Sequence, residues 1–364
     1  MKIKDIIAEI ERFAPPTLQE PYDNSGLLAG NANTQVAGVL LSLDCTESVV
    51  DEAIDQNCNL IVSHHPLIFS GLKSITGKNY VERTLIKAIK NDVVLYAAHT
   101  NLDHVAQGVN KKISDKLGLT NTKILSPKPN LLRKLITFVP KIHLQSLQSA
   151  LFEAGAGQMG NYTETSFWSS GTGSFKPNNQ AKPYVGNPNE RHSEPESRLE
   201  IVFETHNEQQ IIQALIKNHP YEEVAYDVIT LQKSHQNIGS GMVGVLPKPM
   251  SEPELMELIK HIFGVKTIRH TELLGKKVEK IAVCGGSGRF LLPNAIAQQA
   301  DVFVTADFKY HEFFDAQRQI VVMDIGHYES EQFTVEIFDA IIRKKFSNFV
   351  PKISKINTNP IFYT

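Results

Sequence analysis

Short apolar runs alternate with amphipathic segments in the first 126 residues. The runs 38–44, 60–63 and 93–98 are almost continuously apolar, as expected of strands that are buried on both faces. Between them, residues 46–55 and 80–91 carry apolar side chains at helical spacing. This alternation predicts an α/β fold with a mainly parallel sheet covered on both faces by helices.

The same alternation returns in the last third of the chain. Residues 279–288 read as a strand that runs into glycines, and 301–311 and 319–332 read as strands followed by polar side chains. An apolar stripe then predicts one long helix over roughly 328–346. A faint similarity between DNSGLLAG (23–30) and GSGMVGVL (239–246) suggests that this α/β domain has two related halves.

The middle of the chain has a different pattern. Strand signals at 134–140, 198–204 and 224–232, helix signals at 143–155 and 207–219, and polar/apolar alternation around 161–170 give the order β-α-β, β-α-β. That order is typical of a ferredoxin-like α+β domain. The Gly, Pro and Asn-rich stretch 171–197 is expected to be a mobile loop. The chain is therefore expected to contain one discontinuous α/β domain, 1–126 and 236–364, with a ferredoxin-like insert over 127–235.

Composition and charge narrow the class of protein. With 37 basic and 39 acidic residues, the formal net charge is −2. This disfavours non-specific electrostatic binding to nucleic acid or to an acidic membrane. The three cysteines, Cys45, Cys58 and Cys284, are few and widely spaced, as in a reducing compartment. Polar residues interrupt every apolar run, so no membrane span is expected. These features favour a cytoplasmic protein.

Histidines and carboxylates gather just after the predicted strands, where ligands bind in open α/β sheets. His64 and His65 follow one strand, Asp103 follows the next, and His327 and Glu331 are one helical turn apart after a third. Each group also has a plain structural interpretation: a capping histidine, a turn aspartate, an exposed i,i+4 pair. Together the five side chains form an all-nitrogen-and-oxygen ligand set that suits a dinuclear site better than a structural zinc site.

The ligand types permit zinc, manganese or iron without choosing among them. Further side chains at the same strand ends are candidates for acid–base chemistry or for orienting the ligands: His99, His104, Asp307 and His311. GGSG (285–288) lacks the spacing of a phosphate-binding loop and is expected to be a glycine turn.

Several motifs together resemble the GTP cyclohydrolase 1 type 2 homologues, also called Nif-three-like proteins. The matching segments, in order, are YDNSGLLAG (22–30), SHHPLIF (63–69), AHTNLD (98–103), GGSG (285–288), VTADFKYH (304–311) and GHYESE (326–331). The insert resembles the PII/CutA-like domain of the longer bacterial members through HPYEEVAYD (219–227), GNY (160–162) and GSFKP (173–177). One departure is Tyr310, where the family often has a histidine.

The resemblance implies two divalent metal ions per subunit, zinc first among the candidates, held by His64, His65, Asp103, His327 and a bridging Glu331. It also implies a toroidal homohexamer with its sites facing an internal cavity. We expect a metal-dependent hydrolase of a small nucleotide-like substrate. The alternative is a protein without catalytic activity, either a metal-binding or metal-delivering protein or a regulatory ring scaffold.

Overall fold

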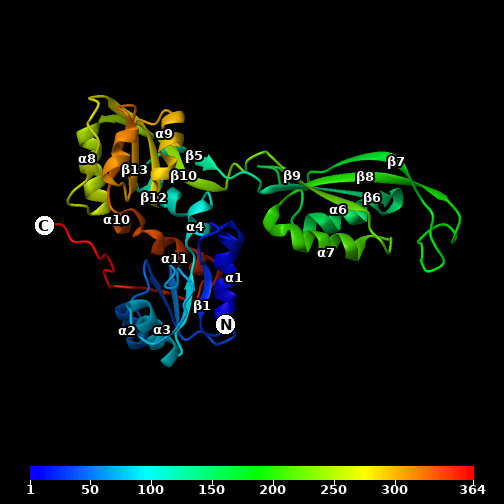
Figure 1. The fold of residues 1–364 in the computed structure, drawn as a ribbon, viewed down its shortest axis with the longest axis horizontal. Helices are drawn as coiled ribbons and strands as arrows, with labels where there is room; N and C mark the ends of the chain where they lie inside the picture. Colours follow the sequence, from blue (N-terminus) through cyan, green and yellow to red (C-terminus); the bar gives the residue numbers. More distant parts are fainter. The chain divides into compact units, whose positions relative to one another are not determined.

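A computed structural model describes all 364 residues, which form two compact units. The first unit joins Met1–Pro127 to Gln236–Thr364, and the second unit, the insert, is Lys128–His235. Figure 1 labels the helices and strands of both. No helix in either unit has the length and apolar character needed to cross a membrane.

The first unit contains a five-stranded sheet in the order β1-β4-β3-β2-β15. Its strands are β1 (Gly26–Ala29), β2 (Val39–Ser42), β3 (Leu60–Ser63), β4 (Val94–Ala97) and β15 (Lys352–Ile353). β2, β3, β4 and β15 are parallel, and β1 is antiparallel to β4. Every residue of β2, β3 and β4 is buried, which explains why these strands are continuously apolar.

Helices cover both faces of this sheet. On one face lie α2 (Glu47–Asp55) and α3 (Tyr80–Lys90), which bury Val50 and Leu85 in a core with Ile61. On the other face lie α1 (Ile3–Phe13) and α11 (Thr334–Lys345), packed together. A 3₁₀ turn, η1 (Pro16–Leu18), follows α1, and α4 (Thr100–His104) and α5 (Val109–Lys116) follow β4.

A second sheet in the same unit has six strands in the order β11-β14-β13-β12-β10-β5. They are β5 (Thr120–Pro127), β10 (Gly239–Ser251), β11 (Arg269–His270), β12 (Lys277–Ser287), β13 (Val302–Ala306) and β14 (Val321–Asp324). Only β12, β13 and β14 pair in parallel. The helical elements around it are α8 (Glu252–Phe263), η4 (Arg289–Leu291), α9 (Leu292–Ala297), η5 (Tyr310–Ala316) and α10 (His327–Glu331).

The α/β class, the helical cover and the mainly parallel sheet predicted for the first part of the chain are confirmed. In the first sheet only β1 is antiparallel, whereas in the second sheet the antiparallel β5, β10 and β11 flank the parallel β12, β13 and β14. One detail predicted for this unit is wrong. The predicted helix over 328–346 is two helices, α10 and α11, separated at Gln332 and Phe333. The apolar stripe lies at Phe333 and within α11, so it does not show whether the polar residues before it belong to the same helix.

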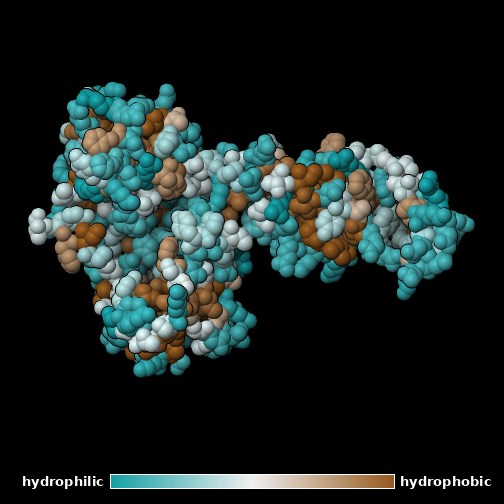
Figure 2. All heavy atoms as spheres, viewed as in Figure 1, coloured by the Kyte–Doolittle hydropathy of each residue, from teal (hydrophilic) through white to brown (hydrophobic).

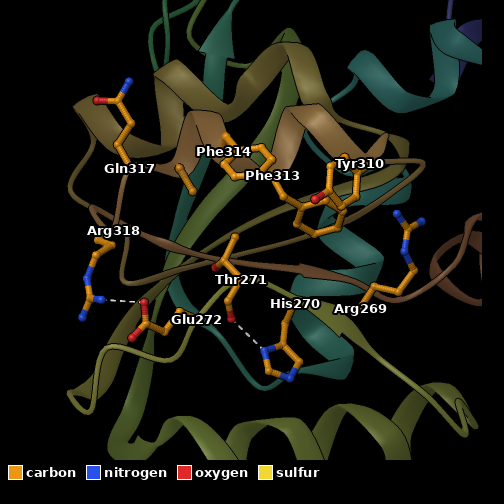
Figure 3. A pocket seen from close by; sticks show the side chains of 10 residues that line it. Arg269, His270, Thr271, Glu272, Tyr310, Phe313, Phe314, Gln317 and Arg318 are labelled. Atoms are coloured by element: carbon orange, nitrogen blue, oxygen red, sulfur yellow. Dashed lines mark hydrogen bonds and ion pairs between the residues drawn. The ribbon is translucent and has the colours of Figure 1, made fainter.

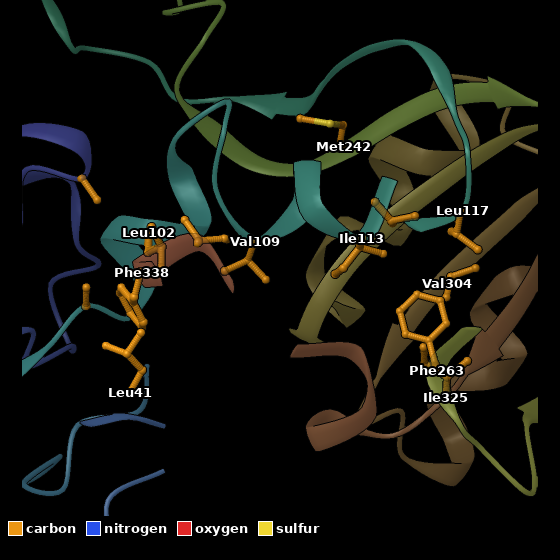
Figure 4. Close-up of a cluster of buried hydrophobic side chains, with 14 of the residues drawn as sticks. Leu41, Leu102, Val109, Ile113, Leu117, Met242, Phe263, Val304, Ile325 and Phe338 are labelled. Atoms are coloured by element: carbon orange, nitrogen blue, oxygen red, sulfur yellow. The ribbon is translucent and has the colours of Figure 1, made fainter. Parts of the chain in front are cut away.

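One hydrophobic core joins the two sheets. Figure 4 shows part of it, in which Leu41 and Phe338 belong to the first sheet and its helix, Val304 belongs to the second sheet, and Ile325 directly follows β14. Ile113 of α5 is buried in the same core. A shared core fixes the two sheets to each other, and with them the side chains that each contributes at its strand ends.

The insert has the predicted ferredoxin-like fold. Its elements are β6 (Leu132–Pro140), η2 (Lys141–His143), α6 (Leu144–Glu153), β7 (Phe167–Phe175), β8 (His192–Glu204), η3 (Thr205–Asn207), α7 (Glu208–Asn218) and β9 (Tyr226–Leu231). The four strands pair antiparallel in the order β7-β8-β6-β9. The expected loop over 171–197 is shorter, because β7 and β8 extend into it and leave only 176–191 outside the strands.

Both insert helices lie on one face of its sheet (Figure 1). Leu147 and Ile211 from these helices pack with Leu199 and Phe203 of β8 to form the core of the insert. The opposite face carries no helix. Large apolar side chains are exposed on the insert, among them Phe167, Ile216 and Ile229, and Figure 2 shows apolar surface there.

Candidate metal centre

The five predicted ligands lie together in the first unit. His64 and His65 directly follow β3, Asp103 lies in α4 after β4, and His327 and Glu331 lie in α10 after β14. Their donor atoms form two groups of three, within each of which all atoms are less than 4.8 Å apart. The cluster therefore draws on the strand ends of both sheets.

Local backbone structure explains how adjacent histidines reach one site. The amide groups of His64 and His65 both donate to the carbonyl of Leu43, and the Ser63 hydroxyl donates to the carbonyl of His65 at 2.9 Å. These bonds turn the chain at the end of β3, so the two rings do not point to opposite faces as they would in a continuing strand. Their centroids are 5.0 Å apart.

Glu331 belongs to both groups of donor atoms. Its Oε2 is 3.0 Å from Nε2 of His65 and 3.0 Å from Nε2 of His327. Its Oε1 is 3.8 Å from Nε2 of His64, which is itself 3.6 Å from Oδ1 of Asp103. One carboxylate thus faces two sets of donors with its two oxygens, which is the arrangement of a bridging ligand.

Each histidine of the cluster is oriented through its Nδ1 atom. The acceptors are the Ala98 carbonyl for His64 at 2.9 Å, Asp44 for His65, Asp307 for His327 and Asp23 for His99, each of the last three at 2.7 Å. A hydrogen on Nδ1 leaves the lone pair of the neutral ring on Nε2, the atom that faces the cluster. Such a second hydrogen bond is the usual companion of a metal-binding histidine.

Two further observations fit a bound cation: donor atoms without hydrogen-bond partners, and a distance between two histidine nitrogens. Nε2 of His64 and Oδ1 of Asp103 are buried and have no hydrogen-bond partner. Nε2 of His65 and Nε2 of His327 are 3.3 Å apart, close to the separation of about 3.3 Å that two nitrogens have when each is about 2.05 Å from a tetrahedral zinc ion. These residues can therefore hold a divalent ion.

Without a cation, the carboxylates of the cluster favour protonation of its histidines. Burial opposes protonation, but hydrogen bonds to Asp44 and Glu331 outweigh it and raise the pKa of His65 to about 9. Burial likewise opposes protonation of His327, whose pKa the neighbouring Glu331 and Asp307 raise to about 11. Burial and the charge of Glu331 raise the pKa of Asp103 to about 7. Metal ions would displace these protons.

A glycine of β12 allows this sheet to approach the cluster. Gly286 has φ +58°, and a Cβ atom there would be 2.5 Å from Oε1 of Glu331 and 3.1 Å from Cε1 of His327. Its amide donates to the Ser330 hydroxyl at 2.9 Å. The GGSG motif thus provides close packing against α10, and most of it lies within β12 instead of forming a simple turn.

Of the four residues predicted to act in acid–base chemistry or ligand orientation, two lie at the cluster and two do not. His99 lies in a group with His64 and His65, and Asp307 holds His327. His104 is buried away from the cluster, between the Leu18 carbonyl at 2.8 Å and Glu20 at 3.1 Å. His311 is exposed and packs on the rings of Tyr310 and Phe314. The structure therefore does not bring His104 or His311 into the cluster.

Asp23 and Asp44 were not among the predicted site residues. Asp44 also accepts a hydrogen bond from Thr358, near the end of the chain. The signal for Asp44 was present, since it ends an apolar run as the other site residues do. Asp23 gave no such signal, because it lies in a loop before β1, 76 residues before His99.

The fold and cluster define an α/β protein with a candidate metal centre. The chain belongs to the Duf34/NIF3 family (NGG1p interacting factor 3), whose sequence profile matches residues 1–360. The GTP cyclohydrolase 1 type 2 homolog of Halalkalibacterium halodurans is 37% identical over 363 residues, covering 98% of each chain. A Bacillus cereus protein related to NIF3 has 36% identity and a TM-score of 0.85, covering 100% of this chain and 99% of its own.

A weaker likeness involves a smaller part of the chain. CutA from Synechococcus elongatus covers 28% of this chain and 79% of its own, with 19% identity and a TM-score of 0.22. The ferredoxin-like assignment of the insert follows from its own strand order.

Proposed function

We propose that this protein holds two divalent metal ions in the cluster and uses them to hydrolyse a small nucleotide-like substrate. The observation that carries the proposal is the position of the Glu331 carboxylate between two sets of donors. One of its oxygens faces His65 and His327. The other faces His64, whose Nε2 also lies near Asp103. Zinc is the first candidate, and the same donors suit manganese or iron.

In this proposal the ions supply Lewis acidity and make water available as a nucleophile near neutral pH. The protein keeps the donors in place: Asp44, Asp307 and the Ala98 carbonyl hold three imidazoles in one tautomer. His99 is the best-placed acid–base group, because Asp23 holds its Nδ1 and its ring lies 5.2 Å from His64 and 5.4 Å from His65.

A cavity on the second sheet supports the substrate class. It has a volume of about 610 Å³ and is lined by aromatic and cationic side chains, including Tyr310, Phe313, Phe314, Arg269 and Arg318 (Figure 3). Arg269 also contacts Asp324 at 3.1 Å, three residues before His327. Aromatic rings suit a planar base, and an anionic group would share the arginines with Asp324 and Glu272, which already pair with them.

We also propose that the chain assembles into a homohexamer. The support is the motif resemblance, together with the exposed apolar side chains of the insert. Light scattering on the purified protein tests this directly: the expected mass is six times that of the chain, and a monomeric mass contradicts the assembly.

The test of the hydrolase compares metal-reconstituted wild type with His65→Ala, Glu331→Ala and a control, Asp51→Asn, which changes an exposed carboxylate paired with Lys87. We expect hydrolysis of nucleotides or phosphodiesters by wild type and by the control. The two cluster variants should lose both metal and activity. Trace activity that persists in both cluster variants would overturn the hydrolase.

The same preparation tests the non-catalytic alternative. A hydrolase needs an open coordination position for water on its ion. The partial exposure of His327 and Asp307 leaves the cluster accessible from one side. Tightly held metal that exchanges slowly and has no open coordination position, without turnover of any substrate, would favour storage, delivery or a regulatory scaffold.

A further inference from the structure

The insert contains a cavity of its own, with a volume of about 650 Å³. It lies on the side of the sheet opposite the helices, beside β7 and β8, where residues of the 176–191 loop also line it. The lining residues that matter for its chemistry are Phe175, Tyr184, Tyr221, Gly171, Glu196 and Arg198. None of them belongs to the metal cluster.

Glycines in β7 create this hollow. Gly171 is paired with Glu196 and Gly173 with Glu194, so these glycines lie on the sheet face that carries the glutamates. A Cβ atom on Gly171 would have no heavy atom within 4 Å, so the space above it is open. A Cβ atom on Gly173 would be 2.2 Å from Oε2 of Glu196, so this glycine leaves room for the carboxylate.

Glu196 is a buried carboxylate with little compensation. It is 7% exposed, and its one hydrogen bond comes from the Tyr221 hydroxyl, which donates to Oε1 at 2.7 Å. It forms no ion pair, since the guanidinium of Arg198 is engaged by Glu200 at 3.0 Å. Burying a carboxylate without an ion pair is unfavourable, so a cation bound beside Glu196 would stabilise it.

Aromatic rings surround the same space. The Tyr221 ring lies 6.2 Å from that of Phe175 and 6.1 Å from that of Tyr184. The faces of such rings attract organic cations, and a carboxylate among them adds a direct counter-ion. We propose that this cavity binds a small organic ammonium compound, with its charged nitrogen at Glu196 and its carbon skeleton against the rings.

The ammonium group can belong to a simple amine or to an amino acid. Lys176 also lines the cavity and would favour the carboxylate of an amino acid. Isothermal titration of the full-length protein with putrescine, lysine and tetramethylammonium distinguishes these sources. We expect millimolar or tighter binding of at least one probe, with a matching rise in melting temperature.

Three variants locate the binding. Glu196→Gln removes the charge, and Gly171→Val fills the open space; each should weaken binding at least about tenfold. Glu194→Gln makes the same change two residues away on the same strand face, outside the cavity lining, and should bind as wild type does. Equal affinity in wild type and Glu196→Gln, or no binding of any probe to wild type, would overturn the proposal.

A measurement on the ligand-free protein tests separately whether Glu196 lacks a counter-ion. Because Glu196 lacks a counter-ion, Glu196→Gln should raise the melting temperature of the ligand-free protein, or leave it unchanged. A clear fall would mean that the carboxylate is already compensated within the insert, which contradicts the need for a cation. Neither experiment depends on the metal centre, so the two proposals can fail independently.

Discussion

At the scale of single residues, each of two donor histidines in the cluster is paired with a carboxylate that orients its ring. His65 and His327 face Glu331 through Nε2, while Asp44 and Asp307 hold their Nδ1 atoms. The donor histidines were predictable from their places after strands. The orienting carboxylates are harder to predict, because they have no required spacing from the histidines in the sequence.

Asp44→Ala should weaken binding of the ion held by the His65 group by about 10- to 100-fold, because His65 loses the acceptor that fixes its tautomer. Metal titration of the purified variant, with competition by a chelator, measures the loss. Asp51→Asn serves as the exposed control. An affinity equal to that of wild type would show that Asp44 does not orient the ligand.

Glu82 provides a pH-dependent prediction far from the cluster. It is 1% exposed and accepts hydrogen bonds from the amides of Thr76, Gly77 and Lys78. The bonds from Thr76 and Lys78 lower its pKa from 4.5 to about 2. A carboxylate whose pKa is lowered in the folded state stabilises that state above the unfolded pKa. This contribution disappears as the pH falls from about 4.5 to about 2.

Glu82→Gln should therefore be less stable than wild type at pH 7, and the difference should shrink as the pH falls through this window. Urea unfolding at a series of pH values measures it. Glu257→Gln, at a side chain that is 73% exposed, is the control. A difference between wild type and Glu82→Gln that stays constant down to pH 2 would contradict the assignment.

At the scale of elements, the centre is formed where short helices follow strands. α10 has only five residues, His327–Glu331, yet it places two donors one turn apart and packs on β12. Its start at Gly326, with φ +94°, follows β14 after a single residue. The merged helix predicted over 328–346 missed this separate element.

Gly286→Ala tests the close approach of β12 to α10. The new Cβ atom would be 2.5 Å from Oε1 of Glu331, so the carboxylate must move and metal affinity should fall. Gly264→Ala is the matched control, because Gly264 also has positive φ, +68°, but open space around its Cβ position. Both variants should lose about 1 kcal/mol of folding stability from backbone strain, and only Gly286→Ala should lose metal. Equal metal content in the two would contradict this role.

At the scale of the whole molecule, one unit carries the candidate metal centre and the other carries a separate cavity. The insert leaves and re-enters the first unit between β5 and β10, where Pro127 pairs with Gly239 and Ser126 with Ser240. The two ends of the first unit are therefore neighbours in one sheet. Closing them with a short linker would not stretch the chain.

Replacing residues 128–235 with a short Gly/Ser linker should leave the metal content per chain unchanged, because every ligand and every orienting side chain lies in the first unit. Elemental analysis of the reconstituted variant measures this, and light scattering reports whether assembly needs the insert. Loss of metal from a folded variant would show that the insert supports the centre.

Sequence patterns alone determined the α/β class, the ferredoxin-like insert and the five side chains proposed as ligands. These features are local: apolar periodicity reports burial, and strand ends gather polar groups at one edge. Only the tertiary structure showed that two mixed sheets share one core. It also placed the oxygens of Glu331 between two donor sets and paired Asp23 and Asp44 with histidines distant in the sequence. Such contacts depend on packing between distant segments, which no local pattern encodes.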